Sequence, residues 1–276
     1  MPSSMPDPPP SLGGDFPARL KAWRQKRRLS QLELALQAGV SQRHLSFLES
    51  GRANPSRGMI QSLSETLDIP LRDRNDLLVR AGFAPVFGAR ALDDPLLAQA
   101  MAAVRMMLTN HAPFPAVALD RAWNIRLANA PFDRLTAAID ADLWQSIGGA
   151  ERNLMRLFFH PNGLRPYVTN WAAIAPLLWR RAQREADSLG GQDMAAVLAE
   201  LAPLQDAHTR DGAAETALLP VLPLQIERNG IGLALFGVIA TFGTAQDVTA
   251  DELRIELLFP ADAQTEALLR ALAASY

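Results

Sequence analysis

The sequence of 276 residues contains no cysteine. This absence excludes disulfide bonds, thiolate metal sites and cysteine nucleophiles. No apolar run reaches the roughly 18 residues that a membrane-spanning helix needs. The Pro-rich segment 1–14 also lacks the apolar core of a signal peptide. We therefore predict a cytoplasmic protein without membrane association, in which residues 1–14 form a flexible leader.

Signals of catalysis are also missing. The chain has four histidines, and none of them lies at the spacing of a zinc-binding helix. No nucleophile elbow appears, and the Gly-Gly pairs at 148–149 and 190–191 lack the Lys-Ser/Thr of a phosphate loop. We therefore predict no catalytic residues, no metal and no cofactor, and we expect that the protein is not an enzyme.

Hydrophobic residues make up 49% of the chain, which is enough to build packed cores in two modest domains. Charge is divided unevenly. Between Asp15 and Arg57, nine Lys and Arg residues face three acidic residues, a local charge of +6; because the net charge is −2, the remainder carries −8. This division indicates that only the N-terminal part meets a polyanion, although an ordinary solvated face is the alternative.

The most informative stretch is 30–56. Ser30, with Glu33 three residues later, predicts a capping box at the start of a short helix. Gly39 supplies a turn that needs positive φ, and Ser41 predicts the cap of a second helix. Together these signals form the helix-turn-helix pattern, in which the second helix enters the major groove of DNA.

Three more amphipathic helices are predicted around this motif, at 15–28, 59–67 and 72–81. Five helices at this spacing resemble the phage-repressor type of DNA-binding domain, the XRE family. The resemblance covers about 17–81 and includes the turn glycine, the caps and the segment Glu49-Ser50-Gly51-Arg52. It implies a phosphate contact from Gln31, an ion pair between Arg24 and Glu49, and base-reading positions at Gln42, Arg43 and Phe47.

The chemistry of these side chains agrees with such roles. Arg43 can bond a guanine edge with two hydrogen bonds, and Gln42 can do the same with adenine; plain solvent exposure is the alternative for both. Phe47 cannot donate a hydrogen bond, so we expect either apolar contact, for example with a thymine methyl, or packing within the domain. Phosphate contacts are expected from Ser41, His44 and Arg52.

The second half of the chain mixes helices and strands. Helices are predicted at 95–111, 131–144, 170–188, 193–201 and 262–273, and strands at 116–119, 124–128, 218–227, 231–241 and 252–259. Asn229-Gly230 marks a tight hairpin, and Pro220 and Pro223 place the strand before it at an edge. This order fits a PAS-like domain, with a five-stranded antiparallel sheet and helices packed on one face.

The segments FPAVALDRAWNIRLAN and NLMRLFFHP, followed by a Trp-bearing helix, resemble the MmyB-type ligand-binding domain that follows an XRE-type head in bacterial regulators. The resemblance implies an apolar pocket, occupied in some members by a fatty acid. Candidate pocket residues are aromatic, with plain core packing as the alternative: Phe158, Phe159, Trp171 and Trp179. Arg156 is a candidate anchor for a ligand carboxylate, with a surface salt bridge as the alternative.

The predicted fold class is therefore α+β: a flexible leader (1–14), a five-helix DNA-binding domain (15–82), a linker (83–93) and a PAS-like ligand-binding and dimerisation domain (94–276). We predict a bacterial one-component transcriptional regulator that binds a double-stranded DNA operator as a homodimer. A small apolar, fatty-acid-like effector in the C-terminal domain is expected to modulate it. The alternative is a constitutive dimeric repressor whose C-terminal domain only dimerises or docks a partner protein.

Overall fold

The computed structural model describes residues 16–149, 151–187, 191–206 and 220–274. The chain divides into two compact units: an N-terminal unit, residues 1–89 with 246–248, and a C-terminal unit, residues 90–245 with 249–276. The predicted leader and the first two residues of the strand predicted at 218–227 lie outside the described residues. In the described ranges, no helix is long and apolar enough to span a membrane.

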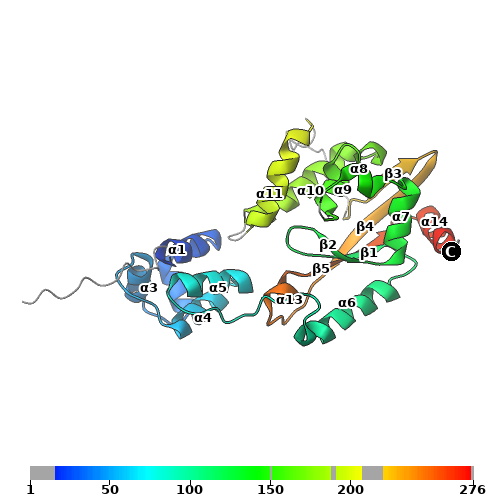
Figure 1. Ribbon diagram of the computed structural model, residues 1–276. Coiled ribbons are helices and arrows are strands. Elements are labelled where there is room, and N and C mark those ends of the chain that lie inside the picture. The colour runs from blue at the N-terminus through cyan, green and yellow to red at the C-terminus, as the bar shows by residue number, and fades with distance from the viewer. Residues whose placement is uncertain (1–15, 150, 188–190, 207–219, 275–276) are drawn as a thin grey trace, which may run out of the picture. The chain divides into compact units, whose positions relative to one another are not determined.

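The N-terminal unit is helical (Figure 1). Both α1 and α2 pack against α3, and α4 packs against α5. All five predicted helices are confirmed, and the bounds of α1, α4 and α5 lie within two residues of the prediction: α1 Phe16–Lys26, α2 Gln31–Gln37, α3 Gln42–Glu49, α4 Arg57–Thr66 and α5 Leu71–Arg80. Their apolar stripes supply fully buried side chains from every helix, among them Leu20, Leu34, Leu45, Ile60 and Leu77.

The C-terminal unit is built on one sheet, with the strand order β2-β1-β5-β4-β3 and antiparallel pairing throughout. The strands are β1 Ala116–Leu119, β2 Ile125–Ala128, β3 Leu224–Arg228, β4 Ile231–Ala240 and β5 Arg254–Pro260. Asn229 and Gly230 both have positive φ, 53° and 78°, as a two-residue hairpin turn between β3 and β4 requires. The predicted five-stranded antiparallel sheet is therefore confirmed.

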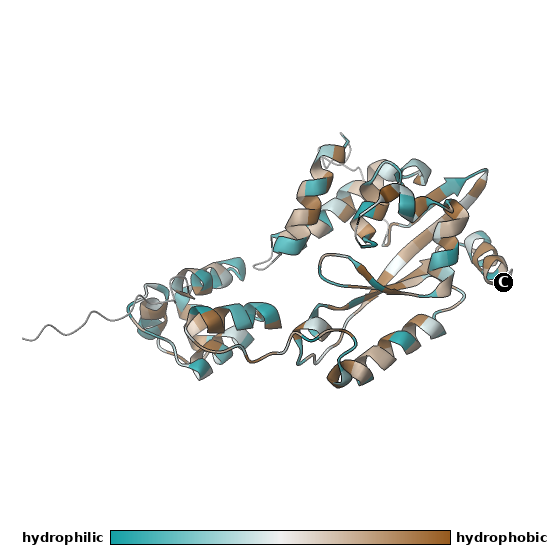
Figure 2. Ribbon diagram, in the orientation of Figure 1, coloured by the Kyte–Doolittle hydropathy of each residue, from teal (hydrophilic) through white to brown (hydrophobic). Residues whose placement is uncertain are grey.

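Helices cover both faces of this sheet, which corrects the expectation of one covered face. Alternate residues of β1 point to opposite sides. Val117 belongs to the large cluster with α7, α9, α10, α11 and α14, whereas Ala116 belongs to a second cluster with α6. Figure 2 shows hydrophobic residues along the strands between these layers. The helices are α6 Ala98–Asn110, α7 Ala130–Ile139, α8 Leu143–Ile147, α9 Leu154–Phe159, α10 Trp171–Ala186, α11 Gln192–Leu201, α13 Val248–Glu252 and α14 Ala263–Ala274.

Two predicted elements differ from the structure in their bounds. The helix predicted at 131–144 is interrupted at Asp140, whose extended backbone ends α7 and whose carboxylate accepts a hydrogen bond from the Asp142 backbone N–H at 3.0 Å. Such a bond competes with helical pairing. The strand predicted from 218 begins only at Leu224. The backbone of Pro223 faces away from β4, and its carbonyl accepts a hydrogen bond from Asn170 Nδ2 at 2.8 Å.

Candidate DNA-binding surface and ligand pocket

Local chemistry fixes the geometry of the α2–α3 motif. The Ser30 hydroxyl accepts a hydrogen bond from the Glu33 N–H at 3.1 Å, and Glu33 accepts one from the Ser30 N–H at 2.7 Å, so the predicted capping box is present. Gly39 has a φ of 67°, which allows the sharp turn between the helices. Ser41 caps α3 by accepting a hydrogen bond from the His44 N–H at 3.1 Å.

A buried ion pair braces α3 from behind. Arg24 of α1 donates two hydrogen bonds to the Glu49 carboxylate at 2.6 and 2.8 Å, which confirms the predicted pair. Gln31 Nε2 donates a third at 2.9 Å, so one of its two N–H groups is used inside the unit. The side chains of Arg24 and Glu49 are only 10% and 3% exposed. Both helices that flank α3 are thereby tied to its last turn.

The electrostatics of this brace favour the charged pair. Burial on its own raises the pKa of Glu49, but the hydrogen bonds from Arg24 and Gln31, together with the charges of Arg24 and Lys21, hold that pKa below its ordinary value. The hydrogen bond to Glu49 raises the pKa of Arg24, although burial acts in the opposite direction. Each charge is therefore compensated, as a buried ion pair must be to be tolerated.

The outward side of the motif carries the predicted DNA-contacting residues. Ser41, Gln42, Arg43 and Arg52 are exposed, and Gln31, His44 and Phe47 are half-buried. The Arg43 guanidinium lies 5.4 Å from the centre of the Phe47 ring, so one turn of α3 presents a cation stacked on an aromatic side chain. The structure thus brings these side chains together on one side of a braced, capped helix.

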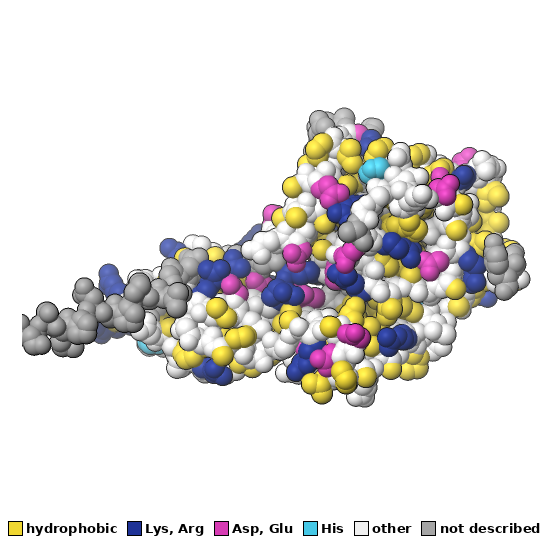
Figure 3. Space-filling view, viewed as in Figure 1, with side chains coloured by type: hydrophobic (Ala, Val, Ile, Leu, Met, Phe, Trp, Pro, Cys, Tyr) yellow, Lys and Arg dark blue, Asp and Glu magenta, His cyan; other side chains and the backbone are white. Residues whose placement is uncertain are grey.

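Some of the basic charge near this motif serves the fold instead. Arg27 donates hydrogen bonds to the carbonyls of Leu67 and Asp68 at the end of α4, where free carbonyl groups need donors. Arg19 forms ion pairs with Asp73 and Asp76 of α5. Further Lys and Arg side chains lie at several places on the visible face of the N-terminal unit (Figure 3). The local excess of +6 is therefore only partly available to a polyanion.

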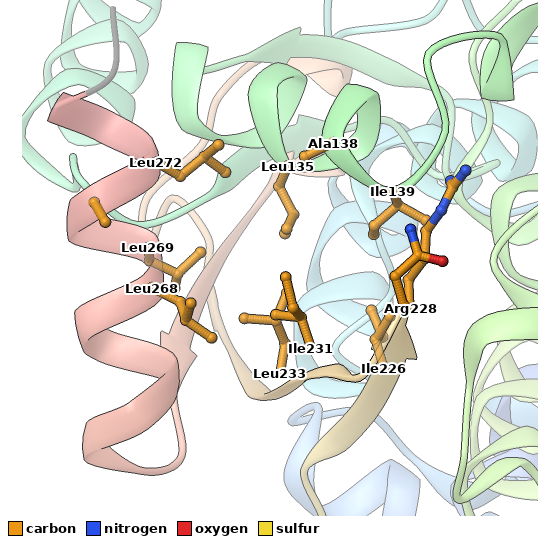
Figure 4. Close-up of a pocket in the computed structure, with 12 residues that line it drawn as sticks. Leu135, Ala138, Ile139, Ile226, Arg228, Ile231, Leu233, Leu268, Leu269 and Leu272 are labelled. Carbon is orange, nitrogen blue, oxygen red and sulfur yellow. The ribbon is translucent and has the colours of Figure 1, made fainter.

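The C-terminal unit contains a pocket of about 340 Å³ between α7, the β3–β4 hairpin and α14 (Figure 4). Its lining is almost entirely aliphatic: Leu135, Ala138, Ile139, Ile226, Ile231, Leu233, Leu268, Leu269, Ala271 and Leu272. The two polar residues of the lining are Arg228, the last residue of β3, and Asn229 in the turn. A mostly apolar concave site with few polar groups is typical of a small-molecule pocket.

Arg228 gives this pocket its chemical character. Its guanidinium lies 5.1 Å from the centre of the Tyr167 ring, and its Nη1 atom is buried without a hydrogen-bond partner among the described residues. A buried N–H of a charged group that lacks an acceptor is costly. The pocket therefore combines aliphatic walls with an arginine at its edge, whose guanidinium extends away from the labelled aliphatic side chains (Figure 4). An aliphatic site bordered by a cation suits an apolar molecule with an anionic end.

Comparison with known families assigns both units. The model of the MmyB-like transcription regulator ligand-binding domain matches residues 100–272, more than half of the chain. The chain belongs to the MmyB-like transcription regulators. A helix-turn-helix model, of the XRE type, matches residues 20–73. This regulator thus joins a DNA-binding head to a ligand-binding domain in an α+β fold.

Comparison with individual proteins adds little to this assignment. No curated protein matches the regulator. A solved structure, "Structure of an RNA-binding Light-Oxygen-Voltage Receptor", is 15% identical with a TM-score of 0.27. The match covers 94% of this chain and 62% of that one, so the regulator spans less than two thirds of its length.

The residues predicted to bind ligand lie elsewhere in the regulator. Arg156 donates hydrogen bonds to both oxygens of Glu200, at 2.8 and 2.7 Å, and this contact raises the pKa of Arg156 despite partial burial. Phe159 packs edge-to-face with Trp171 and Trp179, each at 5.2 Å between ring centroids. Phe159 and Trp179 belong to the core cluster, and Phe158 and Trp171 pack against it. None of the predicted ligand-binding residues is among those that line the pocket at Arg228.

Sequence reasoning missed Arg228, although a signal was present. In β3, Leu224, Ile226 and Arg228 share one face because alternate residues of a strand point the same way. A cation in register with two apolar residues next to a hairpin turn indicates a charged group turned toward the core. The pocket lies between α7 and α14, which are more than 120 residues apart in the sequence. The spacing of residues along the chain does not predict this contact.

Proposed function

We propose that this regulator binds a pseudo-palindromic operator as a homodimer, that α3 reads the bases, and that a small apolar effector with an anionic end controls binding. The observation that supports the DNA role best is the outward side of α3. Gln42 and Arg43 are exposed there on a helix that the pair Arg24–Glu49 holds in place. A single motif reads one half-site, which is why we propose a dimer.

Each side chain on the outward side of the motif has a proposed role. Arg43 bonds a guanine edge, Gln42 bonds adenine, and Phe47 contacts a thymine methyl while it supports the Arg43 guanidinium. Ser41, His44, Arg52 and the free N–H of Gln31 contact phosphates and fix the register of α3 on the duplex.

The test of this assignment is selection of binding sites from random duplexes by the wild type and by Arg43→Ala. Loss of a bidentate contact costs about 1–3 kcal/mol and relaxes the base preference at one position of each half-site. Arg105→Ala, which removes an exposed arginine of α6, is the matched control. An unchanged preference in Arg43→Ala would remove Arg43 from base reading.

The effector proposal rests on the aliphatic pocket that Arg228 borders. Ten aliphatic residues suit a hydrocarbon chain, and the unsatisfied Nη1 of Arg228 suits a carboxylate. A fatty-acid-like molecule has both parts. If such a ligand prefers one of two dimer geometries, it shifts the spacing of the two α3 helices and thereby changes operator affinity.

Thermal melting with dodecanoate and with dodecanol tests the apolar pocket and the anionic anchor separately, because the two molecules share a hydrocarbon chain and differ in the charge of the end group. A ligand present at a hundred times its Kd stabilises a protein by about 2.7 kcal/mol. We expect dodecanoate to raise the melting temperature of the wild type, and we expect Arg228→Gln to weaken its binding about tenfold or more, because a hydrogen bond to a charged group contributes about 1.5–3 kcal/mol. Dodecanol should bind both proteins alike.

Arg156→Gln is the matched control, because Arg156 is the anchor that the sequence suggests and it already pairs with Glu200. Loss of dodecanoate binding in Arg156→Gln but not in Arg228→Gln would move the anchor to Arg156. If no fatty acid of any chain length raises the melting temperature, and if no small molecule is released from a denatured sample, the constitutive repressor would be favoured.

A further inference from the structure

Half of β4 has an open edge. This strand, Ile231–Ala240, pairs with β3 only from Ile231 to Leu235, whereas it pairs with β5 from Leu235 to Ala240. In the described part of the chain, no strand lies on the outer side of 236–240. An antiparallel edge of this kind carries a row of backbone donors and acceptors ready to pair.

The alternation of backbone groups identifies which ones are open. Ala234 donates its N–H to Thr265 Oγ1 and accepts a hydrogen bond from the Ala261 N–H, both on the β5 side. In an antiparallel strand, alternate residues direct both backbone groups to the same neighbour. The groups of 236, 238 and 240 therefore point to β5, and those of Gly237 and Ile239 point to the open side.

The sequence leaves this edge open by diverting the chain that precedes β3. Continued pairing would place Pro223 opposite Phe236, a non-hydrogen-bonded position at which the backbone of residue 223 faces away from β4. Asn170 instead holds this part of the chain: its Nδ2 donates to the Pro223 carbonyl at 2.8 Å, and its Oδ1 accepts from the Gln225 N–H at 3.0 Å. The outer side of β3 is thus bound near α10, and the hairpin stops at Leu235.

The open segment also lacks the features that protect an edge. Residues 236–242, FGVIATF, include no charge and no proline. Val238 and Ile239 are 46% and 44% exposed, although both are large and apolar. Natural edges that stay unpaired are protected by Lys, by Pro or by bulges. An uncharged, apolar, unprotected edge is therefore best explained by a strand that covers it.

We propose that β4 pairs antiparallel with the β4 of a second copy of this chain, across a two-fold axis at Val238. This register is the one that uses all four open groups, because Gly237 of each copy then lies opposite Ile239 of the other and exchanges two hydrogen bonds with it. The segment is compatible with itself because it carries no charge. The inference rests on the homodimer of the proposed function, and it names the surface that forms it.

The register makes a sharp geometric prediction. Val238 faces its own copy as a non-hydrogen-bonded pair, for which the Cα atoms lie about 4.5 Å apart. That separation falls within the range of about 4.4–6.8 Å that a disulfide spans. Because the chain has no cysteine, any cross-link must come from an introduced one.

Cysteine substitutions along β4 in the full chain therefore test the pairing. Under mild oxidation we expect Val238→Cys to form a reducible dimer at least tenfold faster than Ile231→Cys, although Ile231 is more exposed, at 55%. Gly237→Cys and Ile239→Cys should also be slow, because neither residue lies opposite its own copy. Equal rates at all four positions would overturn the proposed register.

Sedimentation of Ile239→Lys provides the second measurement. Two lysines next to the axis repel each other, and we expect the dimer Kd to rise at least tenfold, whereas Leu96→Lys, at another exposed apolar position, should leave it unchanged. Unchanged circular dichroism would show that Ile239→Lys folds. An intact dimer in Ile239→Lys would overturn this interface but leave a homodimeric regulator with another contact surface. If the wild type stays monomeric even on operator DNA, both the β4 interface and the proposed homodimer would be overturned.

Discussion

Glu49 shows how one residue serves two purposes in the N-terminal unit. Its carboxylate accepts hydrogen bonds from Arg24 and Gln31, so it fixes the last turn of α3 against α1 and α2. It lies behind the side of α3 that carries Gln42 and Arg43, both of which are exposed. One buried carboxylate therefore contributes both to the stability of the N-terminal unit and to the orientation of α3, which carries Gln42 and Arg43.

Removal of one partner of this brace should be far more damaging than removal of both. Arg24→Ala leaves Glu49 buried and unpaired, and we expect it to destabilise the fold by about 3–5 kcal/mol. The double variant Arg24→Met with Glu49→Met should recover much of that loss, since apolar side chains need no partner. Arg52→Ala, at an exposed position, should stay within about 0.5 kcal/mol of the wild type. Urea unfolding of the variants measures these differences.

The brace also sets the acid sensitivity of this unit. Because the pKa of Glu49 is lower in the folded than in the unfolded state, its contribution to stability is present above the unfolded pKa of about 4.3 and is lost as pH falls through the folded value. Glu49→Gln should be less stable than the wild type near neutral pH, and its stability should fall less as pH drops below about 4. Parallel pH profiles for the two proteins would show that Glu49 does not titrate in this way.

At the scale of single elements, α3 depends on its cap. The Ser41 hydroxyl closes the first turn, and the same residue is proposed to contact a phosphate. Ser41→Ala should cost about 1 kcal/mol of stability. Ser41→Asn and Ser41→Asp both retain a capping oxygen and should fold as stably as the wild type, but only Ser41→Asp places a negative charge beside the DNA backbone.

Ser41 has two roles to separate: it caps α3, and it is proposed to contact a phosphate. Measuring both operator affinity and melting temperature for these three variants separates them. We expect Ser41→Asp to lose affinity at least tenfold while Ser41→Asn keeps most of it. Equal affinity of the two variants would mean that Ser41 caps the helix but lies away from phosphate.

The elements also show how far sequence reasoning reaches in this chain. The five helices of the N-terminal unit could be predicted because caps, the turn glycine and apolar spacing are local signals, and so is the hairpin at Asn229-Gly230. The break at Asp140 rests on one short-range bond, from the Asp142 N–H to the Asp140 carboxylate, which the apolar spacing of the helix does not reveal. The position of α6 on the second face and the late start of β3 could not be predicted, since tertiary contacts such as that of Asn170 with Pro223 decide them. The pocket at Arg228 was missed for the same reason.

At the scale of the whole molecule, the two units differ in charge. The N-terminal unit, residues 1–89 with 246–248, has twelve Lys and Arg and nine Asp and Glu, a net charge of +3, and the C-terminal unit therefore carries −5. Figure 3 shows Asp and Glu side chains interspersed with Lys and Arg on the visible face of the C-terminal unit, so basic groups there have acidic neighbours. Attraction to a nucleic acid should therefore arise in the N-terminal unit, and it should depend strongly on salt.

The salt dependence can be assigned to individual residues. The logarithm of the association constant falls linearly with the logarithm of salt concentration, with a slope of about −0.9 for each phosphate that is neutralised. Arg52 is exposed just beyond α3, and a homodimer presents two copies, so Arg52→Ala should make the slope shallower by about 2. Arg105→Ala, at an exposed position of the C-terminal unit, should leave the slope unchanged. A change of about 1 for Arg52→Ala would instead indicate that one half-site is bound, and no change would place Arg52 away from the phosphates.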